Sequence, residues 1–220
     1  MCQLHEILID STASSNQDAY ANRQQLIYYP NLLDEHFADE VFATLINQSQ
    51  FNHHRISLFG RTVLEPRLTN WYGEPHCLYT YSGRQRRPDP FPPCLQQLRQ
   101  KLIEQLTACD ILQSMVAEAA INCALVNLYR DGADGVGWHR DNEQTLSGHI
   151  FSLSLGATRN FDLKHQKTGE KHRIPLHHRD CVVMTKGLQK NWLHCVAKSK
   201  RVTSPRINIT FRQYISNPLP

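Results

Sequence analysis

Apolar residues in the first half of the chain recur with the spacing of amphipathic helices. Residues 37–48 place apolar side chains on one helical face, and the acidic residues Asp34 and Asp39 are typical of the start of such a helix. A second helix is predicted to begin at Pro92-Pro93, because proline suits a first helical turn. The predicted apolar stripes are Phe37, Val41, Phe42, Leu45 and Ile46 in the first helix, and Leu95, Leu98, Leu102, Ile103 and Leu106 in the second.

The apolar pattern changes to period 2 from residue 120 onward, which predicts strands. Turns rich in Gly, Asp and Pro separate five of them: Ile121–Leu128, His149–Leu155, Arg159–Lys164, Cys181–Thr185 and Arg206–Tyr214. Helices followed by strands predict an α+β fold with a mainly β core, in which helices cover one side of a largely antiparallel sheet or barrel. Residues 1–25 are expected to be a loose lead-in to a single domain over residues 26–220.

Composition narrows the class of protein further. Of the 220 residues, 40% are hydrophobic, which suffices for a sizeable core. A run of roughly 20 apolar residues that would span a bilayer is missing, as is a secretory signal pattern at the N-terminus. The seven cysteines are odd in number and form no Cys-x-x-Cys pair, which favours a reducing compartment. We therefore expect a monomer without a membrane partner, cytoplasmic (nucleoid-associated in a bacterium) or nuclear, and not secreted.

Basic charge is concentrated in one part of the chain. The chain carries 24 Lys+Arg and 20 Asp+Glu, and residues 159–201 hold eleven of the basic and three of the acidic residues. That window is therefore +8 and the rest of the chain −4, which suggests a polyanionic partner, although a solvated lysine-rich surface would give the same count. Lys198, Lys200 and Arg201 are the candidate phosphate contacts.

His139, Asp141 and His194 form a candidate metal site. Residues two apart in an extended segment point to the same side, so His139 and Asp141 can reach one ion, and His194 can supply a third ligand from another strand. Two imidazoles and one carboxylate leave positions open and suit non-haem Fe(II), whereas the His-x-Asp pair alone fits zinc equally well.

Strict alternation over residues 206–212 defines a second polar constellation. Ile207, Ile209 and Phe211 are expected to face the core, while the opposite face carries Arg206, Asn208, Thr210 and Arg212. Two inward-facing arginines need anionic partners, and a dicarboxylate offers two. By the same alternation Asn127 and Tyr129 share a face and can contact the same ligand.

Taken together, these residues resemble the AlkB family of Fe(II)- and 2-oxoglutarate-dependent dioxygenases, most closely the branch that repairs alkylated DNA. The resemblance covers roughly residues 58–214 and is carried by an ordered set of motifs: Asn127-x-Tyr129, His139-x-Asp141, His194, Arg206-x-Asn208-x-Thr210-x-Arg212, Ser154-Leu155-Gly156-Ala157-Thr158-Arg159, Phe59-Gly60-Arg61, Glu65-Pro66-Arg67, Trp71-Tyr72-Gly73 and Tyr79-Thr80-Tyr81-Ser82-Gly83. It implies a double-stranded β-helix (jelly-roll) with flanking N-terminal helices, a nucleotide-recognition lid at roughly 52–90 and a catalytic core at roughly 115–215.

The resemblance also assigns roles at the reactive centre. It implies that His139, Asp141 and His194 bind Fe(II), and that the enzyme uses 2-oxoglutarate and O2 as cosubstrates. Arg206 would pair with the distal carboxylate of 2-oxoglutarate and Arg212 with the carboxylate beside the keto group. Asn127, Tyr129, Asn208 and Thr210 complete the implied cosubstrate site.

The implied substrate residues lie mostly in the lid. Tyr81 would stack a flipped base against His139, with Tyr79, Ser82 and Arg61 nearby, and Glu143 would accept a hydrogen bond from the base's exocyclic amine. Phe59 resembles a finger that fills the gap left by a flipped base, although it could equally be a core residue. Asn142 stands where close relatives usually carry an acid.

The resemblance implies oxidative demethylation of 1-methyladenine and 3-methylcytosine in DNA, a direct-reversal repair that releases formaldehyde, succinate and CO2. Two alternatives stay open at this stage. One is the same chemistry on RNA or another methylated substrate, and the other is a nucleic-acid-binding module without catalytic activity.

Overall fold

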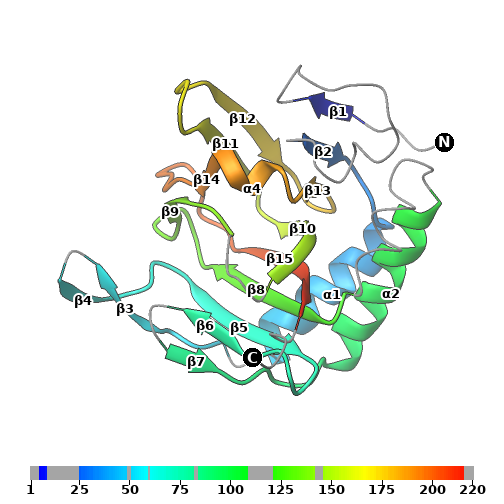
Figure 1. Cartoon of the computed structure of the whole chain (residues 1–220). Helices are drawn as coiled ribbons and strands as arrows, with labels where there is room; N and C mark the ends of the chain where they lie inside the picture. Colours follow the sequence, from blue (N-terminus) through cyan, green and yellow to red (C-terminus); the bar gives the residue numbers. More distant parts are fainter. Residues whose placement is uncertain are drawn as a thin grey trace.

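The structure of the chain is a computed structural model, and it describes residues 5–8, 25–48, 51–58, 60–81, 84–108, 121–141 and 146–215. Among these residues, no helix is long and apolar enough to cross a bilayer. Figure 1 shows two helices packed side by side against a sheet, with a second sheet and two hairpins around it.

The larger sheet has seven antiparallel strands. In spatial order they are β1 (His5–Leu8), β2 (Gln25–Tyr29), β13 (Cys181–Met184), β10 (Leu146–Gly156), β15 (Arg206–Tyr214), β8 (Cys123–Tyr129) and β5 (Leu68–Gly73). The smaller sheet runs β12 (Lys171–Leu176), β11 (Arg159–His165), β14 (Trp192–Val196) and β9 (Val136–His139), and a short helix, α4 (Leu188–Asn191), precedes β14. Apolar residues from both sheets, such as Ile150 of β10 and Leu163 of β11, share one buried cluster, so the sheets pack face to face as in a jelly-roll.

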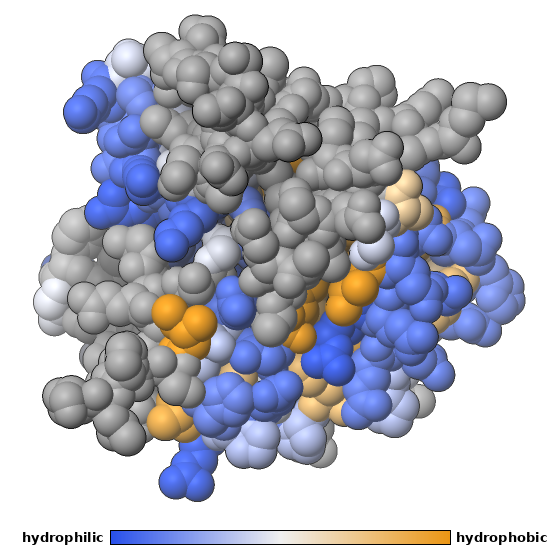
Figure 2. Space-filling model, turned by 45° about the vertical axis from the view of Figure 1, so that its right-hand side comes forward, coloured by the Kyte–Doolittle hydropathy of each residue, from blue (hydrophilic) through white to orange (hydrophobic). Residues whose placement is uncertain are grey.

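Helices α1 (Glu35–Gln48) and α2 (Pro93–Thr107) cover the outer face of the larger sheet. Asp34 caps α1, because its Oδ1 accepts the N–H of Phe37 at 3.1 Å. Four of the five leucine and isoleucine positions expected in the α2 stripe are fully buried, whereas Ile103 is only partly so. The side of Figure 1 on which the helices lie comes forward in Figure 2, where most of the coloured residues are hydrophilic and the apolar ones form small patches.

Strand β15 separates the core from the site by its alternation. Ile207, Ile209 and Phe211 are fully buried in the cluster shared with α1 and α2. The alternate side chains, Arg206, Asn208, Thr210 and Arg212, are buried between the two sheets and line a cavity there. The predicted division of this strand into an apolar and a polar face is therefore confirmed, as is the predicted jelly-roll with flanking helices.

Several elements differ from the sequence prediction. The lead-in expected over residues 1–25 contains β1, which pairs with β2, and the predicted strand Ile121–Leu128 begins at Cys123 and ends at Tyr129. The sequence pattern predicted no strand for β2, β5 or β12, and it placed His139 in an extended segment and His194 on another strand without bounds for β9 or β14. Strands β5 and β14 are buried along most of their length and β9 has only four residues, so their residues do not alternate clearly in hydrophobicity along the chain.

Two hairpins stand beside the larger sheet, β3 (Arg55–Leu58) with β4 (Arg61–Leu64), and β6 (Tyr79–Tyr81) with β7 (Arg84–Arg86). All four residues of β4 are exposed. Ile56 of β3 lines the cavity between the sheets, so the first hairpin borders its opening. Both hairpins lie in the segment expected to form the lid.

Candidate metal centre

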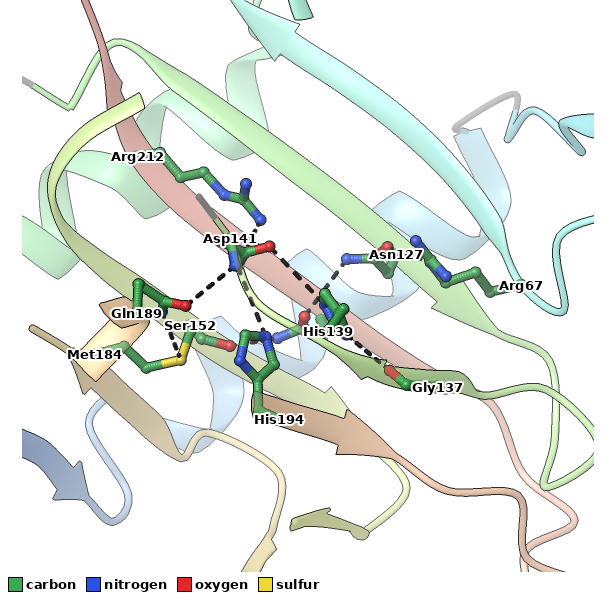
Figure 3. A network of polar contacts seen from close by, with 11 residues as sticks. Arg67, Asn127, Gly137, His139, Asp141, Ser152, Met184, Gln189, His194 and Arg212 are labelled. Carbon is green, nitrogen blue, oxygen red and sulfur yellow. Dashed lines mark hydrogen bonds and ion pairs between the residues drawn. The ribbon is translucent and has the colours of Figure 1, made fainter. Parts of the chain in front are cut away.

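The sheet register and one segment beyond it bring the three predicted metal ligands together. His139 is the last residue of β9 and pairs directly with His194 of β14, which places their ring centroids 4.3 Å apart. Asp141 follows two residues after the end of β9, and its carboxylate oxygens lie 3.9 Å from Nε2 of His139 and 3.8 Å from Nε2 of His194. The candidate ligand atoms all lie within 4.8 Å of one another (Figure 3).

The donor set fits a divalent first-row metal such as iron. Nitrogen and carboxylate ligands at about 2.0–2.2 Å from a metal stand about 3 Å apart when adjacent, so only small side-chain movements would close this triad on an ion. Burial lowers the pKa of His194 to about 3, with a further contribution from His139, so its imidazole is neutral at physiological pH. Both histidine and carboxylate must be deprotonated to bind a metal.

Asp141 is ionised by its positive neighbours. Burial by itself would raise the pKa of its carboxyl, but the charge of Arg212 lowers it to about 2, with further contributions from His194 and His139 in their protonated forms and from Arg67. Nη2 of Arg212 donates to Oδ2 of Asp141 at 3.1 Å. The carboxylate is therefore oriented and charged before any metal binds.

All six residues predicted to hold the cosubstrate line the same cavity as the metal triad. The cavity has a volume of about 360 Å³. These six residues come from two neighbouring strands, β8 and β15: Asn127, Tyr129, Arg206, Asn208, Thr210 and Arg212. The structure thus places the metal triad and a polar, arginine-rich wall around one space.

Arg206 is the strongest sign of an anionic ligand in this cavity. Its side chain is only 1% exposed. Nη2 donates to Oγ of Ser154 at 2.8 Å and the guanidinium carbon lies 5.3 Å from the Tyr129 ring centroid, but Nε and Nη1 have no hydrogen-bond partner among the described residues. Burial lowers the pKa of this guanidinium to about 10. A buried cation with two unsatisfied donors fits the carboxylate of a bound ligand.

Arg67 and Gln189 also shape the site and were not assigned roles from the sequence. Nε of Arg67 donates to Oδ1 of Asn127 at 2.8 Å, Nδ2 of Asn127 donates to Oδ1 of Asn208 at 3.5 Å, and Nδ2 of Asn208 donates to Oγ of Ser152 at 2.7 Å. Gln189 accepts the backbone N–H of Asp141. The motif Glu65-Pro66-Arg67 was a signal for the arginine, whereas no sequence pattern pointed to Gln189.

The structure gives less information on the predicted substrate residues. Arg61 is exposed on β4 and does not line the cavity, and the backbones of Tyr79 and Tyr81 form β6. The side chains of those tyrosines lie outside the described part of the structure. Phe59, Ser82, Asn142 and Glu143 lie outside the described residues altogether.

The candidate phosphate contacts lie in an exposed loop between β14 and β15: Lys198, Lys200 and Arg201. Two backbone hydrogen bonds of 2.8 Å tie this loop to Gly132, from Ser199 N to Gly132 O and from Gly132 N to Val202 O. A Cβ at Gly132 would lie 1.7 Å from the Ser199 carbonyl oxygen, so the approach requires glycine. The loop is thereby fixed to the turn that leads into β9.

Comparison with known proteins gives one family. The model of the 2OG-Fe(II) oxygenase superfamily matches residues 25–212. The chain is 31% identical over 200 residues to human DNA oxidative demethylase ALKBH2, covering 85% of this chain and 72% of that protein. It is 33% identical over 202 residues to human alpha-ketoglutarate-dependent dioxygenase alkB homolog 3, covering 86% of this chain and 66% of that protein.

A solved structure supports the fold. The structure of OsALKBH1 superposes with a TM-score of 0.56 at 15% identity, covering 86% of this chain and 97% of that chain. At that identity the likeness concerns the arrangement of strands and helices alone.

Proposed function

The chain belongs to the AlkB family within the 2OG-Fe(II) oxygenase superfamily and is a dioxygenase, and we propose that it removes methyl groups from ring nitrogens of nucleobases in DNA. The expected lesions are 1-methyladenine and 3-methylcytosine. The single observation that carries the proposal is that His139, Asp141 and His194 converge on the cavity that also contains buried Arg206.

The chain's own residues would hold the metal and the cosubstrate. His139, Asp141 and His194 would hold Fe(II), and with 2-oxoglutarate the metal supplies the O2 activation that hydroxylates a methyl group. Arg206 and Arg212 lie at opposite ends of the polar face of β15, and Arg212 lies beside Asp141. This arrangement supports a role for Arg212 in binding the carboxylate of 2-oxoglutarate nearest the metal, and a role for Arg206 in binding the distal carboxylate.

The products follow from the chemistry of an N-methyl group. One oxygen atom of O2 enters the C–H bond, and the resulting hemiaminal breaks its C–N bond to give formaldehyde and the unmodified base. The other oxygen atom converts 2-oxoglutarate into succinate and CO2. The protein's task is to place the methyl group beside the metal and to keep competing water and substrates out.

A nucleic-acid substrate is supported by two features. The relatives include proteins named as DNA oxidative demethylases, and the exposed loop with Lys198, Lys200 and Arg201 offers cations to a phosphate backbone. A base within a duplex hides its methyl group, so we propose that the base flips into the cavity bordered by the β3–β4 hairpin.

Mass spectrometry of defined oligonucleotides tests this function. Single- and double-stranded DNA and matched RNA, each carrying one 1-methyladenine or 3-methylcytosine, are incubated with the protein, Fe(II), 2-oxoglutarate and O2, and the loss of one methyl group is followed with succinate formation. Faster loss from DNA is expected. Faster loss of the methyl group from RNA would show that RNA is the preferred substrate. Absence of succinate with every substrate would refute the proposed activity.

A further inference from the structure

The three candidate metal ligands are not held in place in the same way. His139 and His194 face each other in the β9–β14 ladder, so backbone hydrogen bonds of the sheet fix both. Asp141 lies beyond the last residue of β9 and takes part in no strand pairing. Its main chain therefore needs another anchor if the carboxylate is to meet the two imidazoles.

That anchor is the side chain of Gln189, which comes from α4. Oε1 of Gln189 accepts the backbone N–H of Asp141 at 3.1 Å. Nε2 of Gln189 donates to Sδ of Met184 at 3.6 Å, and Met184 lines the cavity. Only an acceptor can face a backbone N–H, so the amide has one orientation, and Figure 3 shows Gln189 bridging Asp141 and Met184.

A second contact joins the same two segments. Nη1 of Arg140 donates to the backbone carbonyl of Lys190 in α4 at 3.3 Å. Helix α4 runs directly into β14, which carries His194. The segment with Asp141 is thus attached to the element that positions another ligand of the triad.

We propose that Gln189 is a positioning residue for the metal site, whose side-chain acceptor fixes the backbone of Asp141 and thereby the third ligand. The inference rests on the metal site proposed above. Groups that orient ligands from outside the coordination sphere typically change metal affinity 10–100-fold when they are removed. The same range is expected for the loss of the Gln189 acceptor.

The test is titration of the metal-free protein with Co(II), which accepts the same nitrogen and oxygen ligands and reports coordination by its visible absorption. Gln189→Met keeps the length and apolar packing beside Met184 but replaces the amide oxygen by a thioether sulfur, a much weaker acceptor, and Gln189→Ala removes the acceptor without adding bulk. Both are expected to bind Co(II) 10–100-fold more weakly than the wild type. Gln189→Glu keeps an acceptor and is expected to restore binding to near the wild-type value.

Gln166→Met is the matched control. Nε2 of Gln166 donates to the Lys190 carbonyl in the same helix at 3.5 Å and does not contact Asp141, so Co(II) binding should not change. Thermal unfolding of each metal-free variant separates weakened coordination from loss of fold.

The outcomes distinguish the inference from the metal site itself. If Co(II) binding is lost in Asp141→Ala but stays at the wild-type level in Gln189→Met and Gln189→Ala, the role of Gln189 is overturned and the metal site stands. Equal weakening in Gln189→Glu and Gln189→Met would also overturn it, because the acceptor would then not be the cause. Failure of the wild type to bind Co(II), or unchanged binding in Asp141→Ala, would overturn the proposed metal site.

Discussion

Replacing Arg206 by methionine should stabilise the ligand-free protein against unfolding. The same change should abolish the additional stabilisation that bound 2-oxoglutarate provides. The guanidinium is 1% exposed, and two of its nitrogens have no hydrogen-bond partner among the described residues. A buried charge of this kind destabilises the native state unless an anion is bound beside it. An apolar side chain of similar length carries no such penalty. The substitution therefore separates the contribution of Arg206 to 2-oxoglutarate binding from its effect on the free energy of unfolding.

The magnitude follows from the buried charge. Burial, together with the nearby charge of Arg159, lowers the pKa of Arg206 from 12.5 to about 10. At 1.36 kcal/mol for each pKa unit, this difference corresponds to about 3 kcal/mol. Loss of the hydrogen bond to Ser154 lowers the free energy of unfolding by about 1 kcal/mol. The expected net increase for Arg206→Met is therefore about 2 kcal/mol.

Urea unfolding of Arg206→Met and wild type, with Co(II) alone and with Co(II) plus 2-oxoglutarate, measures both effects. At a thousandfold excess over its dissociation constant, a ligand that binds only the native state stabilises it by about 4 kcal/mol. The wild type should show this gain and Arg206→Met should not. Arg87→Met, which removes an exposed arginine, is the control and should leave both quantities unchanged.

Two results would refute this reasoning. If ligand-free Arg206→Met were less stable than the wild type, the contacts with Ser154 and Tyr129 would already compensate the buried charge. If the variant gained as much stability from 2-oxoglutarate as the wild type, Arg206 would not be the cosubstrate anchor.

Three further variants test other parts of the protein. Asp141→Ala should abolish demethylation of a methylated oligonucleotide, since one ligand of the triad is lost, and near-wild-type turnover would show that the triad is wrongly assigned. Reversing Lys198, Lys200 and Arg201 to glutamate should weaken DNA binding and flatten its dependence on salt concentration, and unchanged binding at several salt concentrations would make this loop a merely solvated surface. Phe59→Ala should lower activity on a double-stranded substrate much more than on the same single strand, because only a duplex stack has to be opened at a cost of a few kcal/mol. Equal losses on both strands with a lowered melting temperature would place Phe59 in the core.

Local periodicity predicted the elements whose two faces differ. Arg206–Tyr214 forms β15 with the expected bounds, and the helix expected after Pro92 forms α2 at Pro93–Thr107. Strand β14, Trp192–Val196, is buried along most of its length, so nothing in its local pattern marks it. His194 was expected on a strand other than that of His139, but the bounds of that strand were not predicted.

The sequence by itself determined which chemical groups are available and which of them share a face of a strand. Alternation separates Arg206 and Arg212 from the apolar side of β15, and a spacing of two residues relates His139 to Asp141, because side-chain direction in an extended chain has a period of two. Only the tertiary structure decided that His139 lies opposite His194 and that Gln189 reaches the backbone of Asp141. Those contacts depend on the register between strands far apart in the chain and on where α4 packs, and hydrogen-bond ladders and packing between distant segments leave no periodic trace in the local sequence.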